Sequence, residues 1–192
     1  PPGWGATHSV NAVLVTAAVA LALTLATQTA TAWRHTIAGT GAGGFSGDGG
    51  LAILANIRNP GAAVLDASGN IYVVDYGNNR IQKFDSNGNF ILKWGNYGNS
   101  DGQFNSPRDI AVDAQGHIYV ADFGNGRIQK FDSDGNFLLK WGDIGLDPGQ
   151  FSRPHSIGTD NENNIYVGEN FYSNDLSRNY RIQKFDSFGN FI

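Results

Sequence analysis

Two carboxylates stand where they could take part in acid–base chemistry. Asp75 and Asp122 are each followed by an Asn and then by an Arg, Arg80 and Arg127, at the same spacing. Carboxylates with charged neighbours are frequent in catalytic clusters. The constellation recurs after 47 residues, which favours a repeated structural network over one active site. We expect each Asp–Arg pair to tie the second strand of a repeat to the third.

A second candidate is His155, which directly follows a proline that recurs along the chain. The corresponding residues in the other copies are Gly61 and Arg108. Zinc sites need about three protein ligands, whereas His117 falls on a turn at the opposite face and His35 on the predicted closing strand before the repeats. We therefore predict no metal and no cofactor from these residues. A loop histidine with no chemistry of its own remains the simpler interpretation of His155.

Three further signals have structural alternatives. The segment "DSDGN" (Asp132–Asn136) is similar to a calcium loop, but its glycine comes two residues too early, which favours a hairpin turn. Trp94 and Trp141 could stack on sugars, yet they end equivalent predicted strands, and packing between repeats is the favoured interpretation. The glycine-rich run at 36–50 lacks the lysine of a phosphate-binding loop, so we interpret it as a loop.

These residues belong to a repeat of four short β segments. In the middle copy the predicted strands are "DIAVD", "HIYVAD", "RIQKFD" and "NFLLKW" (109–113, 117–122, 127–132 and 136–141). β-branched and aromatic residues fill them, and none has a helical pattern. Glycines separate the first strand from the second and the third from the fourth, where tight hairpin turns need positive φ.

The repeated pattern "P-x-x-I-A-V-D-x-x-G-x-I-Y-V-A-D-x-x-N-x-R-I-Q-K-F" resembles the NHL repeat, a blade unit of β-propellers. It covers residues 60–192 in two full copies and one nearly full copy. The third copy departs from it at Thr159, at "GEN", and by seven extra residues between Val167 and Arg181. The resemblance implies an all-β fold, a β-propeller of four-stranded blades, with about three blades in this chain (60–95, 107–142 and 154–192).

The first 32 residues follow a different pattern, because they contain no Asp, Glu, Lys or Arg. An apolar run from Val10 to Ala26 precedes "ATA", which matches a small-x-small cleavage site, so we predict a signal peptide at 1–32. An uncleaved membrane anchor is the alternative. We expect the true start upstream of Pro1, because a basic segment is missing, and no stable membrane span after processing.

Residues 33–59 are expected to hold a closing strand, near Arg34 to Gly39, and the glycine-rich loop. Propellers usually have four to eight blades, so about three cannot close a ring. We therefore expect this sequence to be a fragment of a longer protein. Two chains that complete one ring as a dimer are the alternative.

Alternating strand direction places the second-to-third loops and the inter-blade loops on one side, called the top face here. Loops on a rigid scaffold commonly carry binding residues. The insertion in the third copy is rich in aromatic and arginine residues, which are enriched at binding hot spots, and we predict that it forms one wall of a ligand site. The ligand-face candidates are Arg108, His155, Phe171, Tyr172, Arg178 and Tyr180.

The composition limits the partners. A formal net charge of -4, with basic residues spread along the 192-residue chain, opposes a nucleic-acid partner. We predict a secreted or cell-surface binding module for a protein, a peptide or an extracellular polymer. The alternative is a propeller enzyme at the channel mouth. It would be a lactonase-like hydrolase or a metal-dependent lyase, because amidating lyases with NHL-like propellers hold a metal through histidines of several blades. A weaker alternative is an intracellular RNA-binding NHL module.

Overall fold

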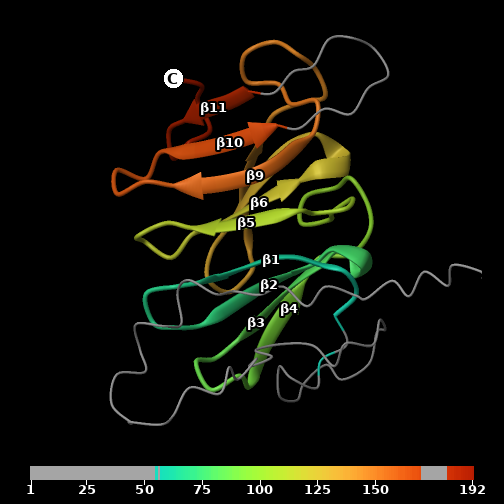
Figure 1. Cartoon of the computed structure of the whole chain (residues 1–192), viewed down its shortest axis with the longest axis vertical. Helices are drawn as coiled ribbons and strands as arrows, with labels where there is room; N and C mark the ends of the chain where they lie inside the picture. The colour runs from blue at the N-terminus through green and yellow to red at the C-terminus, as the bar shows by residue number, and fades with distance from the viewer. Residues whose placement is uncertain (1–54, 56, 170–180) are drawn as a thin grey trace, which may run out of the picture.

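The computed structural model describes residues 55, 57–169 and 181–192. These residues form three antiparallel sheets in chain order, and each sheet corresponds to one copy of the repeat (Figure 1). The predicted signal peptide at 1–32, the predicted closing strand and the insertion at 170–180 lie outside the described residues.

Blade one and blade two each contain four strands in sequential order. Blade one comprises β1 (Pro60–Leu65), β2 (Ile71–Asp75), β3 (Arg80–Phe84) and β4 (Phe90–Trp94). Blade two comprises β5 (Asp109–Val112), β6 (Ile118–Asp122), β7 (Arg127–Phe131) and β8 (Phe137–Trp141). Between the second and third strands lie short 3-10 turns that the sequence pattern had not indicated, η3 (Tyr76–Asn78) and η4 (Phe123–Asn125).

Blade three differs from the predicted four-stranded unit. Its described strands are β9 (Pro154–Thr159), β10 (Ile165–Glu169) and β11 (Arg181–Phe185). An isolated antiparallel bridge joins Phe185 to Phe191, at the position where β4 and β8 begin to pair in the other blades. The described part of blade three is thus a three-stranded sheet with one bridge of a fourth strand.

The hairpin turns are built by aspartates together with glycines. Asp132 Oδ1 accepts hydrogen bonds from the backbone N–H groups of Asp134 and Asn136, both at 2.9 Å, and Oδ2 accepts from Asn136 Nδ2 at 2.8 Å. Gly135 completes the turn at φ +79°, a backbone conformation that L side chains rarely adopt. The segment interpreted as a turn rather than a calcium loop is therefore a hairpin turn whose carboxylate is engaged by its own backbone.

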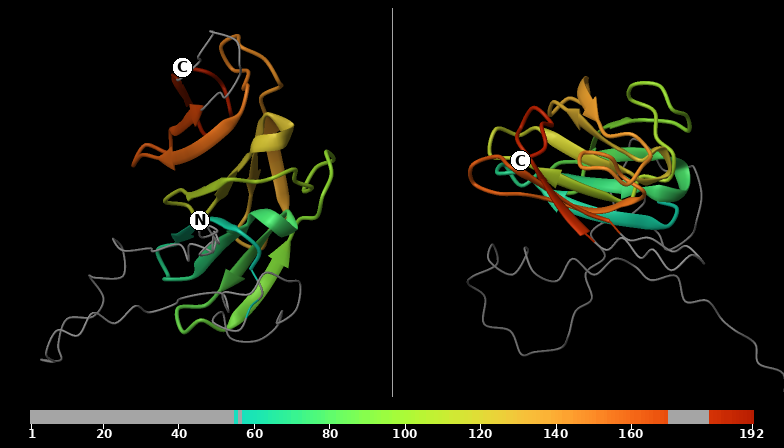
Figure 2. Two further views of the ribbon diagram at one scale, coloured as in Figure 1. Left: turned by 45° about the vertical axis from the view of Figure 1, so that its right-hand side comes forward. Right: turned by 90° about the horizontal axis from the view of Figure 1, so that it is seen from above.

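The three sheets stack along the long axis of the molecule, with the inner strands β1, β5 and β9 side by side (Figures 1 and 2). One face of blade one packs on the opposite face of blade two through Tyr72, Val74, Ile118, Val120 and Phe131. Blade two packs on blade three in the same way. Each fully buried apolar side chain contributes roughly 1.5–3 kcal/mol, so these interfaces form the core.

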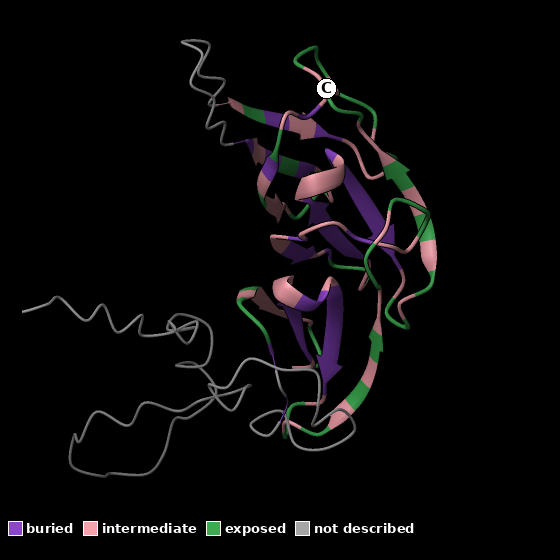
Figure 3. Cartoon of the chain, turned by 90° about the vertical axis from the view of Figure 1, so that its right-hand side faces the viewer, coloured by how far each residue is buried: buried purple, intermediate pink, exposed green. Residues whose placement is uncertain are grey.

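Burial follows this stacking. Every residue of β2, β3, β6 and β7 is buried, whereas β4 and β8 alternate between intermediate and exposed residues (Figure 3). In blade three, Ile182 is 75% exposed although its equivalents Ile81 and Ile128 are fully buried. The reason is that, among the described residues, no further sheet covers that face of blade three.

Candidate functional site

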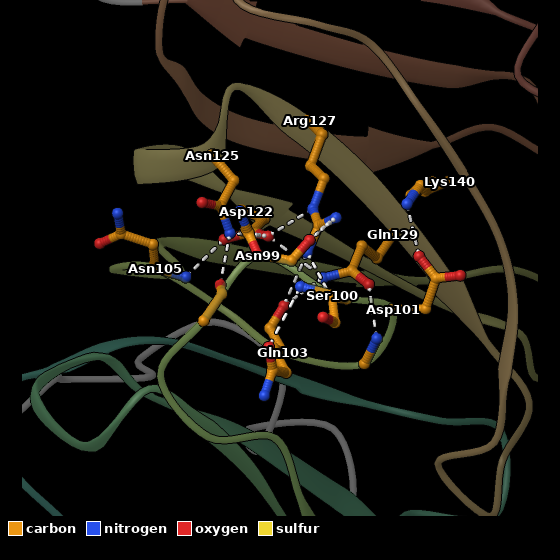
Figure 4. A network of polar contacts seen from close by, with 12 residues as sticks. Asn99, Ser100, Asp101, Gln103, Asn105, Asp122, Asn125, Arg127, Gln129 and Lys140 are labelled. Carbon is orange, nitrogen blue, oxygen red and sulfur yellow. Dashed lines mark hydrogen bonds and ion pairs between the residues drawn. The ribbon is translucent and has the colours of Figure 1, made fainter.

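The repeated Asp–Arg pairs lie at the centre of a buried polar network, shown for blade two in Figure 4. Arg127 Nε donates to Asp122 Oδ2 at 2.8 Å, and Asn125 Nδ2 and Gln129 Nε2 donate to the same oxygen. The backbone N–H of Asn105 donates to Oδ1 at 2.8 Å. The carboxylate therefore joins β6, η4, β7 and the segment that leads into blade two.

The same arginine also holds the loop between β4 and β5. Its Nη atoms donate to three backbone carbonyls, those of Asn99, Ser100 and Gln103, at 2.8–2.9 Å. Burial raises the pKa of Asp122, and the hydrogen bonds from Asn105, Asn125 and Arg127 oppose that shift. Asp122 is fully buried and both of its oxygens accept hydrogen bonds, so the carboxylate links these elements.

Equivalent pairs occur in the other blades. In blade one, Arg80 Nε donates to Asp75 Oδ2 at 2.7 Å. In blade three, Arg181 Nε donates to Glu169 Oε1 at 2.6 Å, so the longer acidic side chain of the divergent copy occupies the same place. Each of the three described blades thus pairs the arginine that begins its third strand with a carboxylate on the second strand.

The tryptophans lie at the blade interfaces. The ring of Trp94 at the end of β4 is 5.7 Å from that of Phe131 in blade two, and the ring of Trp141 is 5.9 Å from that of Phe185 in blade three. These contacts place both tryptophans between blades, the packing arrangement that was favoured over sugar stacking.

A pocket of about 540 Å³ lies on the top face, where the inner strands begin. We call it the entry pocket, and the residues that concern its chemistry are Gly61, Tyr76, Arg108, Asp109, His155 and Ser156. The residues after the recurring prolines, Gly61, Arg108 and His155, meet here because β1, β5 and β9 run side by side. Gly61 is needed for this packing, since a Cβ there would lie 2.4 Å from the carbonyl oxygen of Arg108.

The guanidinium of Arg108 is held by aromatic rings and by a histidine. Its Cζ lies 4.5 Å from the ring centroid of Phe123 and 5.4 Å from that of Tyr76, distances typical of cation–π contacts. Its Nη1 lies 3.2 Å from His155 Nε2. The ring of Phe123 also meets that of His155 edge to face at 6.4 Å. Arg108 is therefore positioned by contacts from all three blades.

The contact with Arg108 fixes the state of His155. A guanidinium can only donate hydrogen bonds, so His155 Nε2 must be the acceptor and the ring proton must be on Nδ1. Burial lowers the pKa of His155, and the charge of Arg108 lowers it further, against a smaller opposing effect of Asp109. His155 is therefore a neutral imidazole at neutral pH.

Asp109 is the acidic group of the entry pocket. Its two oxygens accept hydrogen bonds from the backbone N–H groups of Ile110 and Ile157, both at 2.9 Å. Burial raises the pKa of this carboxyl, and the two hydrogen bonds oppose the shift. Asp109 thus joins β5 to β9 and forms no ion pair among the described residues.

The pocket brings a cation and a neutral imidazole into contact, an arrangement that can bind an anion or hold a weak base beside a positive charge. Within the described ranges no group of three or more His, Cys, Asp and Glu side chains is placed to hold a metal ion. No helix in these ranges is long and apolar enough to cross a membrane.

The structure brings two of the predicted ligand-face residues together, Arg108 and His155. The other four, Phe171, Tyr172, Arg178 and Tyr180, lie outside the described residues. Sequence reasoning missed Tyr76, Phe123 and Asp109. The recurrence of an aromatic residue directly after Asp75 and Asp122 was a usable signal for the first two.

The NHL repeat family model matches this chain at residues 58–84 and 104–131. Among solved structures, an exported protein of Bacteroides fragilis, described as putative, aligns over 76% of this chain and 38% of its own, with a TM-score of 0.56 and 16% identity. Virginiamycin B lyase of Staphylococcus aureus, in a complex with quinupristin, aligns over 70% and 40%, with a TM-score of 0.53 and 16% identity. Hydrazine synthase of Kuenenia stuttgartiensis aligns over 69% and 34%, with a TM-score of 0.52 and 11% identity.

At these identities the likeness concerns the fold alone. The chain spans between a third and two fifths of the length of these solved structures. Among curated proteins, no sequence matches it significantly.

Proposed function

The chain contains two segments that match the NHL repeat and folds into propeller-like blades, and on that premise we propose that it is a binding module whose partner docks at the entry pocket and the loops around it. The partner class is a protein, a peptide or an extracellular polymer. The observation that carries the proposal is that residues from three blades converge on one pocket, with an arginine held in place by Tyr76, Phe123 and His155. Pockets with a few convergent polar groups are the usual binding sites of such scaffolds.

A secreted or cell-surface location belongs to the same proposal. It is supported by the uncharged apolar segment before Ala32 and by the small residues that follow it. The acidic balance of the chain supports a partner other than nucleic acid.

The experiment is a selection of ligands followed by a comparison of two matched tryptophan substitutions. Displayed peptides and an array of polysaccharides are screened against the chain, and selected ligands are measured against Ser156→Trp and Ser86→Trp. Ser156 is an exposed residue that lines the pocket, whereas Ser86 is exposed on a hairpin turn of blade one. We expect Ser156→Trp to weaken binding by about tenfold or more and Ser86→Trp to leave it unchanged. Equal binding by both variants would place the interaction elsewhere.

A second candidate function is a lyase, in which the neutral imidazole of His155 would act as a general base once Nε2 is released from its hydrogen bond with Arg108. The likeness to virginiamycin B lyase makes quinupristin the probe. Incubation of the chain with quinupristin, followed by mass spectrometry, separates the two candidates. The lyase candidate predicts a reaction product that is lost in His155→Ala. The binding proposal predicts that no such product forms.

A further inference from the structure

The charge of Arg108 has no anionic partner in the part of the chain that the structure describes. The arginines of the buried networks each have one: Arg80 pairs with Asp75, Arg127 with Asp122 and Arg181 with Glu169. Arg108 instead contacts two aromatic rings and a histidine. Its Nε is buried and has no hydrogen-bond partner among the described residues. A partly buried cation without a counter-ion is costly unless a ligand supplies the negative charge.

None of the neighbouring titratable groups forms an ion pair with Arg108 among the described residues. Asp109 directs its oxygens to the backbone N–H groups of Ile110 and Ile157 rather than to Arg108. His155 is neutral and accepts a hydrogen bond from the guanidinium. A second cation lies nearby, because Cζ of the exposed Arg153 is 5.4 Å from the ring centroid of Phe123. The entry pocket therefore presents to a ligand a guanidinium that no described carboxylate contacts.

The geometry also limits the ligand class. A sugar ring that stacks in the pocket would compete with Arg108 for an aromatic face, because Tyr76 and Phe123, the described aromatic side chains near the pocket, both contact the guanidinium. A phosphate dianion would need several charged donors, as arginine clusters supply, whereas Arg108 is the one arginine among the residues that line this pocket. A planar guanidinium suits a planar carboxylate.

We propose that Arg108 is the anchor for a carboxylate of a peptide ligand, which enters the pocket and forms an ion pair with the guanidinium that contacts Tyr76 and Phe123. The proposal rests on the binding function proposed above and narrows it to acidic peptides. Tyr76 and Phe123 hold the guanidinium in place, so that little side-chain entropy is lost on binding.

The test uses three synthetic peptides and the full 192-residue chain. The probes are acetyl-Gly-Gly-Glu-Gly-Gly-amide, its Gln counterpart, and acetyl-pentaglycine with a free carboxyl terminus. Binding is followed by NMR chemical-shift titration at neutral pH. We expect at least one carboxylate probe to bind about tenfold or more tightly than the Gln peptide. The Glu and free-terminus probes show whether a side chain or a chain end supplies the carboxylate.

The variants are Arg108→Gln, Arg108→Lys and the matched control Arg153→Gln. We expect Arg108→Gln to abolish the preference for the carboxylate probes and Arg108→Lys to retain part of it, because lysine keeps the charge but loses the planar donors. Arg153→Gln should weaken binding by no more than about threefold, since an exposed charge acts through solvent. Retention of the preference in Arg108→Gln would overturn the proposal, as would equal binding of all three probes or tighter binding of inorganic sulfate at Arg108.

The outcome is separable from that of the proposed function. If ligands selected in the screen are lost in Ser156→Trp but bind Arg108→Gln normally, the pocket is a binding site and the carboxylate anchor is wrong. If both substitutions leave the selected ligands unaffected, both proposals are wrong. Arg108→Lys, with the charge retained, provides the comparison if Arg108→Gln fails to fold.

Discussion

At the scale of single residues, the entry pocket is organised around the contact between Arg108 and His155. The two side chains are 47 residues apart in the sequence, and Nη1 and Nε2 are 3.2 Å apart in the structure. The arginine acts on the histidine in two ways, since it donates to Nε2 and its positive charge disfavours a second proton on the ring. The state of His155 therefore reports directly on the position of Arg108.

We predict that His155 titrates below its ordinary pKa of 6.5 and that Arg108→Gln raises this pKa part of the way back. The recovery is partial because burial, the largest cause of the shift, remains. NMR titration of the imidazole nitrogens measures the pKa and shows which nitrogen carries the proton. A pKa that is identical in both proteins would refute the contact.

The same shift has a consequence for stability. Because the folded state binds the proton of His155 more weakly than the unfolded chain, the stability contributed by the neutral ring is present above a pH of about 6.5 and is lost as the pH falls through the lowered pKa.

At the scale of the elements, buried polar networks fix each blade to the loop that leads into it. The network of Asp122 joins β6 and β7 to the β4–β5 loop through side chains and backbone groups. On the surface, Asp101 of the same loop forms an exposed ion pair with Lys140 of β8, with an N–O distance of 2.5 Å. Burial separates the two pairs energetically, because a lost partner leaves a desolvated charge in one case and a hydrated charge in the other.

We predict that Asp122→Ala lowers the free energy of unfolding by about 3–5 kcal/mol, because Arg127 is left buried without its carboxylate. The matched change Asp101→Ala should cost no more than about 1 kcal/mol, since Lys140 and Asp101 are both close to half exposed. Urea denaturation of the three proteins gives both values. If both variants lost the same free energy of unfolding, the buried Asp122 network would stabilise the protein no more than the exposed Asp101–Lys140 pair does.

At the scale of the whole molecule, stability depends on the stacking of one blade on the next. Glycines of the hairpin turns take part in this stacking: a Cβ at Gly135 in blade two would lie 2.9 Å from the ring of Trp94 in blade one. Gly116, in another turn of blade two, has a similar φ of +83° but no heavy atom within 4 Å of a Cβ. A substitution at Gly116 therefore tests backbone strain alone, whereas a substitution at Gly135 tests backbone strain together with contact between blades.

We predict that Gly116→Ala costs about 1 kcal/mol, the strain of an L residue at positive φ. Gly135→Ala should cost about 1–3 kcal/mol more, because the new methyl group also displaces Trp94. Thermal denaturation followed by tryptophan fluorescence measures both changes. If the two variants melt alike, the turn of blade two does not contact blade one.

Much of the fold was predictable from the sequence, because the information is local and repeated. Alternating apolar residues, turn glycines and the recurring Asp, Asn and Arg predicted four short strands per repeat and the pairing of Asp122 with Arg127. The resemblance to NHL repeats, which those residues carry, predicted the blade architecture. The 3-10 turns were missed, since short Gly-Asn segments are compatible with several turn conformations.

What only the tertiary structure decided is how neighbouring copies differ in their surroundings. Ile128 and Ile182 occupy the same "RIQKF" segment, yet one is fully buried and the other is 75% exposed, because a following sheet covers blade two but none covers blade three among the described residues. Likewise, the sequence marks Arg108 and His155 as equivalent positions of a repeat. They become one site because side-by-side packing of inner strands brings equivalent positions into contact, and Tyr76 and Phe123 join them from the 3-10 turns.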